Sequence, residues 1–154
     1  MKIAVSACLL GENCKYNGGN NLSDAVAKYV KSLMGSETEK ILLVCPETEG
    51  GLPTPRPPAE IAGGKVINKV GEDVTCEFKK GAELCYERIL NTGEQVKIAI
   101  LKAYSPSCGS GKIYDGTFSK SLTDGDGYFA KLLKDNGISV ITEKELESAT
   151  TSCL

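Results

Sequence analysis

Seven cysteines are the residues of this 154-residue chain best suited to chemistry. The chain contains no histidine, so a Ser-His-Asp triad, a Cys-His pair and a metal site with imidazole ligands are all excluded. The chemistry therefore falls to cysteine, serine, acidic residues, lysine, tyrosine, arginine or a bound cofactor. The cysteine count is odd and the first residues contain too short an apolar run for a signal peptide. We therefore expect reduced cysteines in a cytoplasmic protein.

Three of the cysteines occupy equivalent places relative to apolar segments that resemble buried strands. Cys8 and Cys45 each come directly after such a segment, and Cys108 lies in the loop that follows a third one. In an open parallel sheet, ligands bind beyond the carboxyl ends of the strands, so these three thiols are predicted to converge. Three thiolates around one point suit a soft metal or an iron–sulfur cluster.

Other readings of the cysteines stay open at this level. Each could be an ordinary buried cysteine that packs as a small hydrophobic residue. A structural zinc site is a second alternative, although it usually needs four ligands in close Cys-x-x-Cys pairs, which this sequence lacks. Cys14 could supply a fourth ligand because its loop returns towards Cys8. Cys76 and Cys85 are expected to be helix residues without a role in the site, and Cys153 lies near the end of the chain.

Polar residues in the same loops are candidates for proton transfer and substrate contact. Glu47 lies two residues after Cys45, and Ser105 and Ser107 come just before Cys108. A carboxylate near a dry cluster could shuttle protons. Further candidates are Arg56, Glu60, Lys102, Asp115 and Asn17. An ion pair between Arg56 and Glu60 that fixes their loop is an equal alternative, and Lys102 could be structural.

The arrangement of predicted elements indicates an α/β fold. Nearly continuous, β-branched apolar segments predict buried strands, and segments of helical periodicity lie between them. Alternating strands and helices favour a single three-layer domain over residues 1–154, with a mainly parallel, Rossmann-like or flavodoxin-like sheet. We expect an irregular tail from about residue 147. Strands are predicted at 2–7, 40–44, 96–101 and 138–141, helices at 23–34, 75–90 and 128–134, and long loops at 46–64 and 109–127.

Charge and hydropathy narrow the classes of partner. The net charge is −2 and only two of the 18 basic residues are arginines, which argues against a strong nucleic-acid surface. No run of about 18 apolar residues exists, so no membrane span is predicted. A small-molecule substrate is the remaining expectation, and the sequence leaves the oligomeric state open.

Several motifs together resemble a known bacterial family. They are Ser-Ala-Cys-Leu-Leu-Gly at 6–11, Cys-Lys-Tyr-Asn-Gly-Gly at 14–19, the Cys-Pro-Glu segment that runs from 45 to 60, Ser-Pro-Ser-Cys-Gly at 105–109 and Ile-Tyr-Asp-Gly-Thr-Phe at 113–118. This family, long a domain of unknown function, includes the thiouracil desulfidases. The resemblance extends from Lys2 to about Glu145.

The resemblance implies an activity and a cofactor. The activity would be non-redox removal of sulfur from a thiolated nucleobase or a related thiocarbonyl compound. The cofactor would be a 4Fe-4S cluster held by Cys8, Cys45 and Cys108, whose remaining iron binds the substrate sulfur. Oxygen damages such exposed clusters, so aerobic preparation would remove this one.

The resemblance also suggests roles for the polar residues. Glu47 would act as the acid and base, and Ser107 would orient the substrate or water. Ser105, Arg56, Lys102 and Asn17 are candidate substrate contacts.

Two other functions fit the same residues. One is a zinc- or cluster-binding module that carries sulfur to a partner without turnover of its own. The other is a metal-free thiol enzyme that uses Cys108 as its nucleophile, activated by Lys102.

Overall fold

The computed structural model describes the backbone of residues 1–152 and the side chains of residues 1–149. Its centre is a four-stranded sheet in which every neighbouring pair is parallel, as predicted. The order of the strands is β2-β1-β5-β8, which matches the first four strands of a flavodoxin-like sheet. These strands are β1 (Lys2–Ser6), β2 (Ile41–Val44), β5 (Val96–Leu101) and β8 (Ser139–Thr142).

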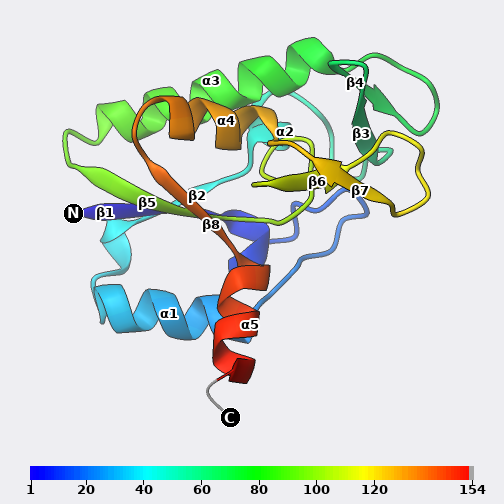
Figure 1. Cartoon of the computed structure of the whole chain (residues 1–154). Helices are drawn as coiled ribbons and strands as arrows, with labels where there is room; N and C mark the ends of the chain where they lie inside the picture. Colours follow the sequence, from blue (N-terminus) through cyan, green and yellow to red (C-terminus); the bar gives the residue numbers. More distant parts are fainter. Residues whose placement is uncertain (153–154) are drawn as a thin grey trace.

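Helices cover both faces of this sheet and confirm the predicted three layers (Figure 1). One face carries α1 and α5, and the other carries α3 and α4. The three helices predicted from the sequence form with ends within one residue of the expected positions, and Ser23 caps the first of them by accepting a hydrogen bond from the Val26 amide. The helices are α1 (Asp24–Met34), α3 (Thr75–Asn91), α4 (Tyr128–Asp135) and α5 (Glu143–Ser152).

Strand β1 shows why the sheet is covered on both faces. Ile3 and Val5 pack in the apolar cluster beneath α1, whereas Ala4 packs in the cluster beneath α3 and α4. Alternate side chains of a strand point to opposite faces, and all three of these are fully buried. The apolar run is therefore continuous because both faces of the sheet belong to the core.

The expectation of an irregular tail from about residue 147 is wrong, because the chain continues as α5 to Ser152. Two contacts fix this helix against the domain. Leu146 packs on the apolar cluster beneath α1, and the Ser23 hydroxyl hydrogen-bonds to Glu147 Oε2 at 3.1 Å. The first helical residue, Glu143, is also buried. Cys153 lies outside the described residues.

The two long loops contain short elements that the sequence did not reveal. The first loop forms α2 (Pro46–Glu49) and the hairpin of β3 (Ala59–Ala62) and β4 (Lys65–Asn68), and the second forms the hairpin of β6 (Lys112–Tyr114) and β7 (Leu122–Asp124). Both hairpins lie beyond the carboxyl ends of the parallel strands (Figure 1). They enclose the edge of the sheet at which Cys8, Cys45 and Cys108 were predicted to meet. Two short 3-10 helices, η1 (Ala7–Leu10) and η2 (Thr38–Lys40), complete the chain.

Over the described residues, every helix is too short or too polar to cross a bilayer.

Candidate active site

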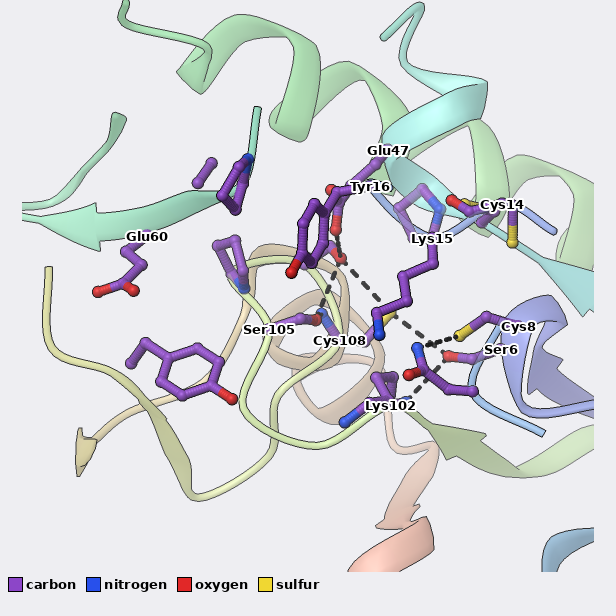
Figure 2. A pocket seen from close by; sticks show the side chains of 18 of the residues that line it. Ser6, Cys8, Cys14, Lys15, Tyr16, Glu47, Glu60, Lys102, Ser105 and Cys108 are labelled. Atoms are coloured by element: carbon purple, nitrogen blue, oxygen red, sulfur yellow. Dashed lines mark hydrogen bonds between the residues drawn. The ribbon is translucent and has the colours of Figure 1, made fainter. Parts of the chain in front are cut away.

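A cavity of about 390 Å³ lies at the carboxyl ends of β1, β2 and β5. Four thiols line it: Cys8, Cys14, Cys45 and Cys108. Figure 2 shows Cys8, Cys14 and Cys108 around one end of this cavity, with Glu60 at the opposite end. The structure thus brings the three predicted cluster ligands to one cavity, and adds Cys14 to them.

Cys8 is positioned by the turn that ends strand β1. It belongs to η1, and its carbonyl accepts hydrogen bonds from the amides of Gly11 at 3.2 Å and Asn21 at 2.9 Å. The Asn21 side chain also donates to Cys8 Sγ at 3.4 Å. The loop that returns from Cys14 therefore fixes this thiol from two sides.

Cys45 immediately precedes the short helix α2. Its amide donates to Glu49 Oε2 at 3.1 Å, and its carbonyl accepts from the Thr48 hydroxyl at 3.2 Å. The helix lies against α3 at a glycine contact. A Cβ added at Gly81 would be 1.7 Å from the carbonyl oxygen of Pro46, so only glycine permits this close approach.

Cys108 is held by its own loop and by the start of α4. Its amide donates to Ser105 Oγ at 2.8 Å, and the Ser6 hydroxyl donates to its sulfur at 3.5 Å. The amides of Tyr128 and Phe129 donate to the carbonyls of Pro106 and Ser107, each at 2.9 Å. The first amides of a helix need hydrogen-bond partners outside the helix. The two carbonyls supply partners for the first amides of α4, and the same hydrogen bonds fix the Cys108 loop to that helix.

Cys14 changes the acidity of its neighbours. A hydrogen bond from Cys14 lowers the pKa of Cys8 below its ordinary value, despite the opposing effect of burial. A second hydrogen bond, between Cys14 and Cys45, together with hydrogen bonds from Thr48, lowers the pKa of Cys45 to about 6. Hydrogen bonds to Cys45 and Cys8 raise the pKa of Cys14 itself. These hydrogen bonds favour the thiolate form of Cys8 and Cys45, which is the form that binds metals.

Cys108 behaves differently, because burial raises its pKa to about 12 despite hydrogen bonds from Ser6 and Ser107. A neutral, buried thiol is a poor nucleophile. This environment argues against the metal-free thiol enzyme considered from the sequence. Lys102, the proposed activator of that thiol, instead pairs with Glu143 at 2.9 Å.

The thiols of Cys8, Cys45 and Cys108 are chemically suited to hold an iron–sulfur cluster. Soft thiolates are the usual protein ligands of such clusters. Among the side chains that the structure describes, residues 1–149, no group of three or more Cys, Asp or Glu is arranged to hold a single metal ion. A 4Fe-4S cluster does not require that arrangement, since each of its thiolate ligands binds a different iron atom.

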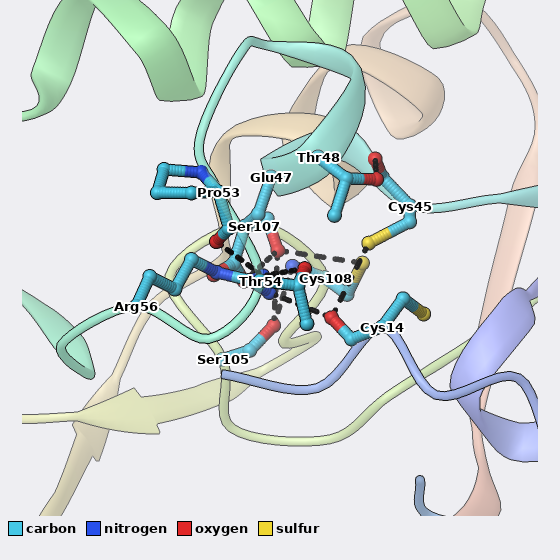
Figure 3. Close-up of polar contacts among 10 residues, drawn as sticks. All are labelled: Cys14, Cys45, Glu47, Thr48, Pro53, Thr54, Arg56, Ser105, Ser107 and Cys108. Carbon is cyan, nitrogen blue, oxygen red and sulfur yellow. Dashed lines mark hydrogen bonds and ion pairs between the residues drawn. The ribbon is translucent and has the colours of Figure 1, made fainter. Parts of the chain in front are cut away.

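Glu47 forms a hydrogen-bonded group beside Cys108 (Figure 3). Its Oε1 accepts from Arg56 Nε at 3.1 Å, and its Oε2 accepts from the Ser107 hydroxyl at 3.0 Å. The Ser107 oxygen is 3.6 Å from Cys108 Sγ and 3.3 Å from the Ser105 oxygen. The carboxylate, the two hydroxyls and the thiol therefore form one continuous polar group on the cavity wall.

Arg56 directs its guanidinium at the protein. Besides Glu47, it donates to the carbonyl of Cys14 at 2.9 Å, the carbonyl of Pro53 at 3.3 Å and the hydroxyl of Thr54 at 3.0 Å. Its side chain is only 5% exposed. The ion pair considered between Arg56 and Glu60 does not form, because Glu60 Oε1 instead accepts from the amides of Gly116 at 3.0 Å and Phe118 at 3.1 Å.

The remaining predicted residues divide into two groups. Ser105, Lys102 and Glu60 line the cavity, whereas Asn17 and Asp115 are not among its lining residues. Asn17 is exposed, and its side chain accepts from the Gly19 amide at 2.9 Å to close a local turn. Asn21 lines the cavity in its place.

Sequence reasoning also missed other residues of the cavity wall. Ser6, the last residue of β1, could have been found by the strand-end rule that selected Cys8. Tyr16, Lys69 and Phe118 come from loops whose course only the tertiary structure reveals; the lining also includes Lys15, Tyr114 and Lys120.

The fold and the cavity define an α/β protein with a thiol-lined site at the carboxyl ends of its parallel strands. The sequence matches the family described as 2-thiouracil desulfurase over residues 3–145. The chain therefore belongs to the 2-thiouracil desulfurase family. This confirms the predicted family and the predicted enzyme class, a desulfidase.

Two individual proteins are similar along almost the whole chain. A solved structure of a [4Fe-4S]-dependent thiouracil desulfidase, TudS, has 41% sequence identity and a TM-score of 0.82, and the match covers 99% of each chain. This neighbour confirms the predicted fold, and its cofactor is the one predicted here. An uncharacterized protein of Bacillus subtilis, YbbK, is 43% identical over 94% of this chain and 97% of its own length.

Proposed function

We propose that this protein is a 4Fe-4S-dependent desulfidase that replaces the sulfur of a thiolated nucleobase, or of a related thiocarbonyl compound, with oxygen. The observation that carries the proposal is that Cys8, Cys45 and Cys108 share one cavity with the hydrogen-bonded pair of Glu47 and Ser107. Membership of the 2-thiouracil desulfurase family supports the reaction class. The cofactor and the substrate of the neighbouring desulfidase support the 4Fe-4S cluster and the thiolated nucleobase in the proposal.

Cys8, Cys45 and Cys108 would hold the cluster as thiolates. When bound, the cluster would supply an iron without a protein ligand, a Lewis acid suited to the soft sulfur of the substrate. Cys14 lies against Cys8 and Cys45 and lines the same cavity. The three proposed ligands are the cysteines that follow the parallel strands, and Cys14 is a further thiol of the cavity wall.

Glu47 would transfer protons during the reaction, and Ser107 would assist it. Water adds to the carbon that carries the sulfur, the carbon–sulfur bond breaks, and hydrogen sulfide and the carbonyl product are released without net redox change. Glu47 would accept one proton from the attacking water and pass it to the leaving sulfur, and the second proton of that water would reach the sulfur as the hydroxyl becomes the carbonyl. Ser107, already hydrogen-bonded to Glu47 Oε2, would orient that water.

Arg56 would act through Glu47. Arg56 lines the cavity, but it donates four hydrogen bonds to protein atoms and its side chain is only 5% exposed. We therefore place Arg56 as a residue that positions Glu47 and the Cys14 loop. Ser105 and Lys102 line the cavity and stay candidate substrate contacts.

Anaerobically prepared protein tests the function directly. We expect iron and acid-labile sulfide in the protein, and release of hydrogen sulfide from 2-thiouracil or 4-thiouracil over many turnovers without a partner protein. Protein with zinc and no iron would contradict the proposal. Sulfide transfer that requires a partner would instead favour the sulfur-carrier alternative.

Single substitutions test the ligand assignment. Cys8→Ala, Cys45→Ala and Cys108→Ala should each lose the cluster absorbance and the activity after anaerobic reconstitution. Cys76→Ala is the matched control, since Cys76 is exposed on α3 and lies outside the cavity lining. Full cluster absorbance in Cys8→Ala would overturn the assignment.

A further inference from the structure

Behind the cavity, a second polar group connects Cys45 to helix α3. Glu49, at the end of α2, accepts the Cys45 amide on Oε2 at 3.1 Å. The same oxygen accepts the Cys85 thiol at 3.0 Å, and Oε1 pairs with Arg88 at 2.7 Å. Cys85 and Arg88 both belong to α3. None of these three side chains lines the cavity, so the desulfidase mechanism does not use them.

We propose that Glu49, fixed by Cys85 and Arg88, is a positioning residue that holds the Cys45 backbone and places a negative charge behind this cluster ligand. The inference rests on the proposed function for its electrostatic part. Its geometric part stands on the metal-free protein alone.

Two backbone contacts restrain the segment that leads into Cys45. Arg88 donates to the carbonyl of Leu43 at 3.0 Å in addition to its pair with Glu49. The carbonyl of Leu43 and the amide of Cys45 are therefore connected, through the Arg88–Glu49 ion pair, to helix α3. The planar guanidinium of arginine donates hydrogen bonds in fixed directions. Arg88 therefore fixes the orientation of the Glu49 carboxylate as well as its distance from α3.

Cys85 supplies a donor from the core. It is fully buried in the apolar cluster beneath α3. Burial, followed by the neighbouring Glu49, raises the pKa of this thiol, which therefore stays protonated and donates its hydrogen bond. Without this donor, the half-buried carboxylate of Glu49 would lose one of the hydrogen bonds that hold it in place.

The charges of the pair predict opposite effects on a cluster bound to Cys45. A negative charge near a cluster favours its more oxidised state, and a positive charge favours its reduced state. Loss of the Glu49 charge should therefore raise the reduction potential, whereas loss of the Arg88 charge should lower it. If Glu49 and Arg88 only held the backbone in place, their loss would not be expected to shift the reduction potential in opposite directions.

The first experiment measures the cluster potential of anaerobically reconstituted Glu49→Gln and Arg88→Gln. We expect a positive shift for the first and a negative shift for the second, with the iron content of the wild type. Glu83→Gln is the matched control, because it removes the same charge from an exposed position on α3. Shifts of the same sign in both variants, or shifts no larger than that of Glu83→Gln, would overturn the electrostatic part.

The second experiment needs no cluster. In metal-free protein, Glu49→Ala should accelerate hydrogen exchange of the Cys45 amide about tenfold to a hundredfold, the effect of losing a hydrogen bond to a charged group. Cys85→Ala should also accelerate it, and Cys85→Ser, which keeps a donor, should restore the protection. Unchanged exchange in Glu49→Ala would overturn the positioning role. If the wild-type protein takes up no cluster, the proposed function is contradicted. The positioning of Cys45 is still established in that case, provided that the variants change the exchange of its amide as expected.

Discussion

At the scale of single residues, the site depends on a carboxylate whose two oxygens have different partners. Glu47 divides its two oxygens between Arg56 and Ser107. Because Arg56 fixes one oxygen, the other stays directed at Ser107 on the cavity wall. The carboxylate is thus oriented before a substrate arrives, which is the condition for efficient proton transfer.

Glu47→Gln tests this role. Glutamine can still accept from Ser107 but cannot take up a proton, so we expect kcat to fall by about 10²- to 10⁴-fold with unchanged iron content. Steady-state sulfide release and cluster absorbance measure the two quantities. Glu12→Gln, exposed in the loop between Cys8 and Cys14, serves as the control. Turnover near the wild-type value in Glu47→Gln would exclude Glu47 as the acid and base.

At the scale of elements, two helices on the same face of the sheet position two of the cysteine loops. The start of α4 binds the carbonyls of the Ser105–Cys108 loop, where a Cβ added at Gly127 would be 2.4 Å from the carbonyl carbon of Ser107. Helix α3 meets α2 at Gly81 in a similar way. Both contacts bring backbone against backbone, so the loops are held by packing as well as by hydrogen bonds.

Gly81→Ala gives a prediction with an unusual sign. Within a helix, alanine usually stabilises by about 0.5–1 kcal/mol relative to glycine. Here the added Cβ would be 1.7 Å from the Pro46 oxygen, so we expect destabilisation of about 1–3 kcal/mol and lower cluster occupancy. Urea unfolding and iron analysis measure both effects. Glu83→Ala, exposed on the same helix, should change stability by no more than about 0.5 kcal/mol. A stabilised Gly81→Ala protein would show that α2 does not need this contact.

At the scale of the whole molecule, most of the core lies apart from the site, and the two meet at the strand ends, where Val44 and Cys108 belong to both. The apolar clusters lie between the sheet and the helices on both of its faces. The cavity lies beyond the carboxyl ends of the strands, among loops and short hairpins. Folding therefore rests on a core of ordinary size for a single domain, and the proposed cluster ligands come from three segments that this core supports.

This separation predicts a folded metal-free protein. Cluster removal should leave the far-ultraviolet circular dichroism spectrum and a cooperative thermal transition in place. Cluster loading should raise Tm, because a ligand that binds only the folded state stabilises that state. Differential scanning calorimetry of matched anaerobic samples measures the shift. A metal-free chain without a cooperative transition would show that the cofactor is required for folding, as in small zinc domains.

The sequence alone determined the parallel sheet, the main helices and the place of three cysteines at strand ends. These features follow from local apolar periodicity and from one topological rule, both of which short segments encode. It also pointed to Glu47 and Ser107, which adjoin two of those cysteines in the chain.

Only the tertiary structure decided which polar groups meet. Arg56 pairs with Glu47 and the Cys14 carbonyl instead of Glu60, Asn21 takes the place expected for Asn17, and the tail becomes α5. Each outcome depends on partners distant along the chain or on the exact course of a loop, as when Glu143 Oε1 accepts the amide of Ala103 at 2.6 Å. Local sequence patterns carry no information about such partners, because burial and hydrogen-bond satisfaction are settled only when the loops pack together.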